Sequence, residues 1–125
     1  EKLKLYRELD SIKDEQRLVE FERRLVDRFG ALPHPAQELL NVVRLRREAI
    51  RLGMERVKIK NGLMLVSFVG EQNTPYFKSK VFMTLLERVT ANPDRFLLRP
   101  KGSRLAMTIR KIENIEAGYK LLREL

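Results

Sequence analysis

Residues that could act as nucleophiles, general bases or metal ligands are scarce in this sequence. Cysteine is absent, which excludes disulfides, a thiolate nucleophile and cysteine-ligated metals, and which permits a reducing compartment. The single histidine, His34, lies between two prolines, so we expect a rigid, exposed loop residue rather than a general base, which needs a positioned partner. One histidine cannot build a zinc site alone, and we find no cluster of acids for a carboxylate site.

Paired carboxylates are the remaining acid/base candidates. Glu15 can share a helical face with Glu22, and Glu20 with Asp27, but arginines surround both pairs. A solvated face is therefore favoured over catalytic carboxylates. The sequence contains neither a G-x-x-x-x-G-K-[ST] phosphate loop nor a G-x-G-x-x-G dinucleotide motif. We predict no catalytic residue, cofactor or metal within this chain.

Basic side chains provide the main candidates for binding. The 125 residues include 26 Lys and Arg against 17 Asp and Glu, a formal net charge of +9, which makes nucleic acid a natural first partner to consider. Two patches could contact phosphates. They are Arg44, Arg47 and Arg51, at helical spacings of three and four, and Arg99, Lys101 and Arg104, around a predicted turn.

Two observations weaken the nucleic-acid interpretation. Lys and Arg side chains also lie over a hydrophobic core and keep a domain soluble, and single-strand binders usually add exposed aromatic platforms. The alternating pattern here directs the phenylalanines mostly inward, namely Phe68, Phe77, Phe82 and Phe96. The charge is also uneven, because residues 1–30 hold 8 basic and 8 acidic side chains. The positive excess lies entirely beyond Gly30.

The spacing of apolar residues predicts the elements that position these side chains. Three helices should come first: one over residues 3–12, one capped by Asp14 and ended by Gly30, and one from about Pro35 to Gly53. We expect Phe29, Leu39 and Ile50 on the inward faces of the second and third helices. We also expect Val81 on the inward face of the helix that follows the first hairpin.

The second half should form two hairpins and two helices. Residues 55–69 turn at Asn61-Gly62, the strongest short hairpin signal, and residues 95–110 turn within 100–103, where Pro100 and Gly102 serve the turn. One helix begins at Thr74-Pro75 and reaches Val89, and the last covers about 111–125. The predicted class is α+β: N-terminal helices followed by ββαββα, with an antiparallel four-stranded sheet and helices packed on it.

The ends and the hydropathy suggest a soluble piece of a longer protein. The chain opens at Glu1 rather than Met, and no stretch approaches the roughly 18 apolar residues of a membrane span. We therefore expect an ordered domain without membrane contact.

Two segments carry a resemblance to a known family. Residues 3–9 (LKLYREL) and 18–57 look like the C-terminal domain of the bacterial transcription-repair coupling factor. The most specific block is 25–33 (LVDRFGALP), followed by 39–46 (LLNVVRLR). The second half agrees in element order and in its closing helix, 119–125 (YKLLREL), although those motifs are generic.

The resemblance implies a large DNA translocase as the parent protein. Members recognise a stalled RNA polymerase on duplex DNA, displace it with ATP and magnesium in a motor outside this region, and recruit the damage-recognition ATPase of excision repair. The expected location is the bacterial cytoplasm, in association with the nucleoid. This chain would then be a non-enzymatic domain of a DNA-repair protein whose motor resembles a helicase.

The resemblance further implies regulation. The family's C-terminal domain packs on the N-terminal module of the same chain, masks the recruitment surface and restrains translocation until polymerase engages. On this basis residues 1–13 would be a linker helix from the motor and residues 14–125 a single regulatory domain; alternatively, the first helix packs on the domain's own core. The alternative function is a basic accessory domain that binds DNA phosphates.

Such a releasable contact should be modest in area and polar. The candidate contact residues lie on the outward face of the second helix, and they are Glu20, Arg24, Asp27 and Arg28. Family members tend to carry acids here, and Arg24 departs from that pattern. Asp27 and Arg28 also have a purely structural interpretation, as residues that fix the helix end over Leu32-Pro33.

Overall fold

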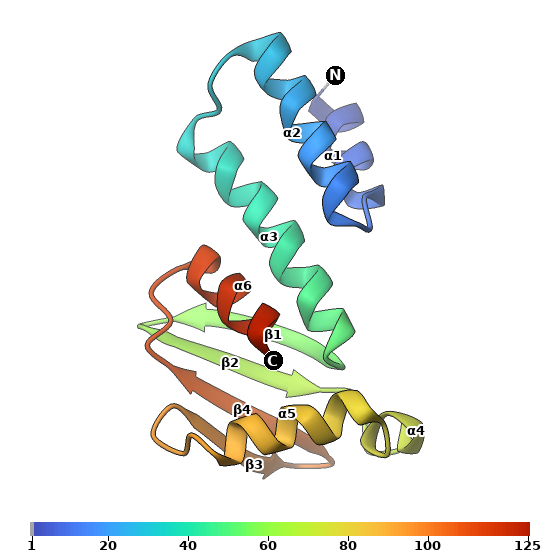
Figure 1. The fold of residues 1–125 in the computed structure, drawn as a ribbon, viewed down its shortest axis with the longest axis vertical. Coiled ribbons are helices and arrows are strands. Elements are labelled where there is room, and N and C mark those ends of the chain that lie inside the picture. The colour runs from blue at the N-terminus through green and yellow to red at the C-terminus, as the bar shows by residue number, and fades with distance from the viewer. Residues whose placement is uncertain (1) are drawn as a thin grey trace.

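The computed structural model describes residues 2–125, which form six helices and four strands (Figure 1). In chain order they are α1 (Lys2–Ser11), α2 (Glu15–Phe29), α3 (His34–Arg51), β1 (Met54–Lys60), β2 (Leu63–Phe68), α4 (Thr74–Phe77), α5 (Lys80–Thr90), β3 (Phe96–Lys101), β4 (Arg104–Arg110) and α6 (Ile115–Glu124). Residue 1, the first of the expected linker segment 1–13, lies outside the described residues.

The four strands form one antiparallel sheet in the order β1-β2-β4-β3. The predicted Asn61-Gly62 turn joins β1 to β2 with φ values of 54° and 76°, the positive values that a type I′ turn requires. The second hairpin, formed by β3 and β4, joins the sheet through β4 and leaves β3 at the edge. The predicted α+β class is confirmed.

Helices α3, α5 and α6 all lie on the same face of this sheet. Alternate strand residues point toward α3, α5 and α6 and are buried among them, and the opposite face carries no helix in the described chain. In Figure 1, α5 crosses in front of β3 and β4, while α6 lies beside α3 above β1. The core they enclose comprises Ala49, Leu52, Met54, Met64, Val66, Phe68, Leu85, Val89, Phe96, Met107, Ile109, Ile112, Leu122 and Leu125.

A second, smaller core lies at the other end of the molecule. Helices α1, α2 and the N-terminal half of α3 enclose Leu9, Leu18, Phe21, Leu40 and Val43. We call this part the helical end, and the sheet with α4, α5, α6 and the last turns of α3 the sheet end. Figure 1 shows α3 running from one to the other, a length of about 27 Å for 18 residues at 1.5 Å per residue.

Helix termini follow the predicted caps in part. The Asp14 carboxylate accepts a hydrogen bond from the Arg17 backbone N–H, and Gly30, with φ of 83°, ends α2 as predicted. The helix predicted from Thr74 to Val89 is instead divided into α4 and α5. The Ser79 hydroxyl accepts from the Phe82 N–H and starts a new helix, so a local cap overrides the apolar periodicity.

The last hairpin and helix also differ from the prediction. Pro100 lies within β3 rather than in the turn, which an edge strand tolerates because its missing donor faces no neighbour. Lys111 adopts a φ of 63°, and Asn114 caps α6, so the helix begins four residues after 111. His34 is exposed as expected, but it is the first residue of α3 rather than a loop residue.

Four residues predicted to face inward are exposed. Phe29 is 58% exposed because it is the last residue of α2, and the Arg28 guanidinium lies 5.1 Å from its ring centroid. Ile50 is 70% exposed, because the buried residues on either side of it, Ala49 and Leu52, turn a different face of α3 into the sheet core. Leu39 and Val81 are also exposed, at the margins of their helices' apolar faces.

A tyrosine fastens the junction between α3 and β1. The Tyr76 hydroxyl donates a hydrogen bond to the Leu52 carbonyl, and its ring lies against Gly53, whose φ is 73°. A side chain at Gly53 would collide with that ring, and its backbone conformation also favours glycine. Burial raises the pKa of Tyr76 to about 12.

Candidate functional site

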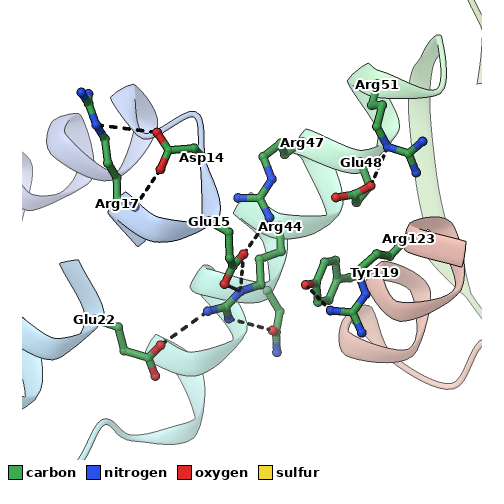
Figure 2. A network of polar contacts seen from close by, with 11 residues as sticks. Asp14, Glu15, Arg17, Glu22, Arg44, Arg47, Glu48, Arg51, Tyr119 and Arg123 are labelled. Carbon is green, nitrogen blue, oxygen red and sulfur yellow. Dashed lines mark hydrogen bonds and ion pairs between the residues drawn. The ribbon is translucent and has the colours of Figure 1, made fainter. Parts of the chain in front are cut away.

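The predicted stripe of Arg44, Arg47 and Arg51 faces other helices of the domain (Figure 2). Arg44 Nε lies 3.2 Å from Glu15 Oε2, and Arg44 Nη2 lies 3.5 Å from Glu22 Oε1. Its side chain is only 16% exposed. Both glutamates belong to α2, so this arginine clamps α2 to α3 and is largely neutralised.

The next two arginines are also bound within the domain. Arg47 Nη2 lies 2.7 Å from Glu15 Oε1, and its buried Nη1 has no hydrogen-bond partner within residues 2–125. Arg51 Nε donates to Glu48 Oε1 over 2.8 Å, and its Nη2 donates to the Leu122 carbonyl of α6 over 3.1 Å. The stripe therefore connects α2, α3 and α6, an arrangement that favours a structural role over phosphate binding.

The outward face of α2 combines acids with apolar side chains. Glu20 and Asp27 are exposed and have no ion-pair partner within the described chain. Val19 and Val26, seven residues apart and so on one helical face, are 39% and 40% exposed. Together with the exposed Arg23, these residues form what we call the α2 strip.

The two other predicted contact residues lie beside the α2 strip. Arg24 turns toward α1, where it forms an ion pair with Glu8, and its guanidinium carbon lies 5.6 Å from the Phe21 ring centroid. Arg28 covers Phe29 at the end of α2. The structure thus brings Glu20 and Asp27 together on one surface and directs Arg24 to a surface ion pair between α1 and α2.

The second predicted basic patch lies on the sheet. Arg104 Nη1 lies 2.8 Å from Glu55 Oε2 and also donates to the Phe68 carbonyl. Arg99 and Lys101 are exposed and have no polar partner within residues 2–125. Across the sheet, β1 adds Arg56, Lys58 and Lys60, which the sequence-based site did not include. The alternation of basic and apolar residues in 56–60 was the available signal.

The described residues contain neither a cluster of metal ligands nor a helix that could cross a membrane. Within residues 2–125, no three His, Asp or Glu side chains come close enough together to hold a metal ion. None of the described helices has the length and apolar character that a bilayer crossing demands.

Comparison with known families identifies the chain. The model of the TRCF domain family matches residues 1–79, which is more than half of the sequence. The chain belongs to the TRCF domain family. Its matched region includes α1, α2, α3, both strands of the first hairpin and α4, and therefore the α2 strip.

Individual relatives of this TRCF domain are transcription-repair-coupling factors. The protein of Escherichia coli (strain K12) is 42% identical over 57 residues, which are 46% of this chain and 5% of that protein. The protein of Buchnera aphidicola subsp. Acyrthosiphon pisum (strain APS) is 26% identical over 121 residues, 91% of this chain and 15% of its own length. The TRCF domain chain thus spans a small part of these relatives.

A solved structure shares the fold of the TRCF domain. The crystal structure of a C-terminal domain of transcription-repair coupling factor superposes with a TM-score of 0.69 and covers 98% of this chain and 78% of that one. The sequence identity is 15%, so this likeness concerns the fold. The family predicted from residues 3–9 and 18–57 is confirmed.

Proposed function

We propose that this TRCF domain is an autoinhibitory domain of a longer transcription-repair coupling protein. It packs on the N-terminal module of the same polypeptide, masks the surface that recruits the damage-recognition ATPase of excision repair, and restrains DNA translocation. Engagement of RNA polymerase releases the contact. The motor, with its ATP and magnesium, lies outside these residues, and the parent acts on duplex DNA in the cytoplasm and nucleoid.

The α2 strip is the observation that carries this proposal. An intramolecular contact that must open needs moderate apolar area and charges that specify the partner without locking it. The strip offers two partly exposed valines in one row and two unpaired acids, Glu20 and Asp27, in the adjacent row. The two acids outnumber the one exposed cation of the strip, Arg23. Its flanking cations, Arg24 and Arg28, are already engaged within the domain. The surface thus favours a partner with basic groups around a small apolar patch.

Helix α1 supplies a route for release. It packs on α2 and α3 through Leu9. It also contacts α2 through the ion pair between Glu8 and Arg24, and Arg24 adjoins the α2 strip. In the proposal, residues 1–13 form a linker helix from the motor and residues 14–125 form the regulatory domain. A pull on α1 would disturb Arg24 and the neighbouring face of α2 together.

Charge reversal in the full-length protein tests the proposal. The double variant Glu20→Lys/Asp27→Lys should raise ATPase rate, translocation along duplex DNA and binding of the damage-recognition ATPase, because the α2 strip would repel its basic partner. Glu71→Lys/Glu87→Lys is the matched control, since both acids are exposed, unpaired and on the sheet end. An unchanged double variant, or equal gains in the control, would refute the autoinhibitory role of the strip.

The alternative function, a basic DNA-binding accessory domain, keeps only part of its expected surface. The patch of Arg44, Arg47 and Arg51 is occupied by Glu15, Glu22, Glu48 and the α6 backbone. The patch on the sheet retains two cations without a side-chain partner in the described residues, Arg99 and Lys101.

A further inference from the structure

One face of the sheet is covered by no element of the described chain. The register places Lys58, Leu65, Thr108 and Leu97 in one row across the four strands, and Arg56, Ser67, Ala106 and Arg99 in the next. None of these outward residues is buried, whereas residues between them along the strands, such as Met64, Val66, Met107 and Ile109, are fully enclosed. We call this surface the open face.

The open face is strongly positive, and its exposed apolar side chains are Leu65 and Leu97. The four strands carry seven basic residues, all on this face, and one acid, Glu55, which pairs with Arg104. The side chains of five of the seven have no hydrogen-bond or ion-pair partner within residues 2–125. They are Arg56, Lys58 and Lys60 on β1, and Arg99 and Lys101 on β3.

The five unpartnered cations form two rims. Between them, the only cations on the described middle strands are Arg104 and Arg110 of β4, which are bound to Glu55 and to the carbonyls of Phe68 and Asp94. Strands β1 and β3 are the two edges of the sheet, and the middle strands contribute Ser67, Ala106 and Thr108 to an open hollow of about 630 Å³. Three inter-strand spacings of about 4.8 Å separate the rims by about 14 Å. The major groove of B-DNA is about 12 Å wide, so the rims can contact phosphates of both strands across a groove.

The composition of the open face favours duplex over single-stranded nucleic acid. Proteins that bind single strands stack bases on exposed aromatic side chains, and the outward strand positions of the described chain include none. The hydroxyls of Ser67 and Thr108 are suited to donate hydrogen bonds to phosphate oxygens.

Edge protection explains only part of this pattern. Charged side chains, lysines above all, discourage edge strands from pairing with other sheets, which accounts for Lys58, Lys60 and Lys101. Edge protection does not account for the uncharged Ser67, Ala106 and Thr108 that lie between the two rims.

We propose that the open face binds the phosphate backbone of duplex DNA without sequence specificity. Arg56 and Lys58 hold one rim, Arg99 and Lys101 hold the other, and Ser67 and Thr108 line the floor. This binding goes beyond the autoinhibitory function, because it uses the sheet end rather than the α2 strip and needs no other domain of the parent.

The test is a titration of the 125-residue chain with a short fluorescent duplex across a salt series. We expect a dissociation constant of about 1–100 µM near physiological salt and a steep log–log salt dependence. The variant Arg56→Gln/Lys58→Gln/Arg99→Gln/Lys101→Gln should weaken binding about tenfold or more and flatten the slope by about 3–4, near 0.9 per lost contact. Arg7→Gln/Arg23→Gln/Lys78→Gln/Lys80→Gln is the control with the same change of net charge.

Each other outcome contradicts the proposal. Equal weakening by the two variants would show attraction by net charge alone, and tighter binding of a single strand would exclude the duplex as the ligand. Polyglutamate that competes as well as DNA would indicate an acidic protein partner. Amide NMR shifts on adding duplex should cluster on β1–β4 in the unmodified chain, a result that does not depend on the folding of any variant.

Discussion

The helical end and the sheet end are held together by different means. The sheet end encloses fourteen buried residues beneath four paired strands. The helical end encloses five, and ion pairs from Arg24, Arg44, Arg46 and Arg47 join its helices. The pairs of Arg24 and Arg46 are exposed, and such pairs contribute only about 0–1 kcal/mol each and weaken with salt. The helical end is therefore the less stable part, and the sheet end is the rigid one.

This difference matches the surfaces that the two ends carry. The α2 strip, proposed to dock and release, lies on the end with the small core and the balanced charge. The open face, proposed to bind DNA, lies on the end with the large core and the positive excess. A releasable contact benefits from low local stability, whereas phosphate contacts at fixed spacing benefit from a rigid sheet.

The largest effect should come from the sheet core. Phe68 is completely buried, and Phe68→Ala should lower the free energy of unfolding by about 3–5 kcal/mol through lost burial and a cavity. Urea denaturation followed by circular dichroism measures this change. Leu97→Ala, on the open face, should change it by less than about 0.5 kcal/mol; similar losses for both would contradict the assignment of the two faces.

A comparable truncation at the helical end should act locally. Phe21→Ala should remove about 3 kcal/mol from the stability of α1 and α2, because Phe21 is a central member of the five-residue core. Amide hydrogen exchange should accelerate across α1 and α2 while β2 and β4 keep their protection. Faster exchange throughout the sheet would instead show that the two ends unfold as one unit.

The ion pairs between α2 and α3 should contribute a smaller amount. Arg44→Ala leaves Glu15 and Glu22 without their partner and should cost about 1–2 kcal/mol, less in high salt. Arg46→Ala is the control, because Arg46 is mostly exposed and its Nη1 lies 3.6 Å from Asp10 Oδ1; we expect a loss below about 0.5 kcal/mol. Thermal melts at two salt concentrations give both values.

The smallest effect concerns alkaline pH and the junction between the two ends. Burial raises the pKa of Tyr76 from 10.0 to about 12. As the pH rises, the unfolded chain therefore loses the Tyr76 proton before the folded chain does. The contribution of Tyr76 to stability is fully present below pH 10.0 and is lost as the pH rises toward about 12. Because the ring is only partly buried, the loss should be about 1 kcal/mol. In Tyr76→Phe this part of the alkaline decline should vanish; an identical decline would exclude Tyr76 as its source.

Local signals in the sequence predicted much of the fold. The Asn61-Gly62 turn, the Asp14 cap and the Gly30 terminator act through backbone conformation and neighbouring hydrogen bonds, which depend on a few adjacent residues. The division at Ser79 was missed because the apolar spacing continues across it. A hydroxyl cap and a helix interior compete there, and the Ser79 cap prevails.

The candidate surfaces depended more on tertiary contacts. Periodicity placed Arg44 and Arg47 on one face of α3 but gave no information on what that face meets, since Glu15 lies in a different helix. The two hairpins were predicted, but not the strand order that places β1 and β3 at opposite edges. That order brings Arg56 and Lys58 onto the same face as Arg99 and Lys101, and so creates the open face.

Hydrogen exchange in the full-length protein tests the central claim most directly. Amide protection across α2 should be higher in the full-length protein than in the 125-residue chain, because docking of the α2 strip would stabilise the helical end, while protection of β2 and β4 should be the same in both. Glu20→Lys/Asp27→Lys should abolish the difference. Equal protection of α2 in the two proteins would contradict the claim that the α2 strip docks within the parent.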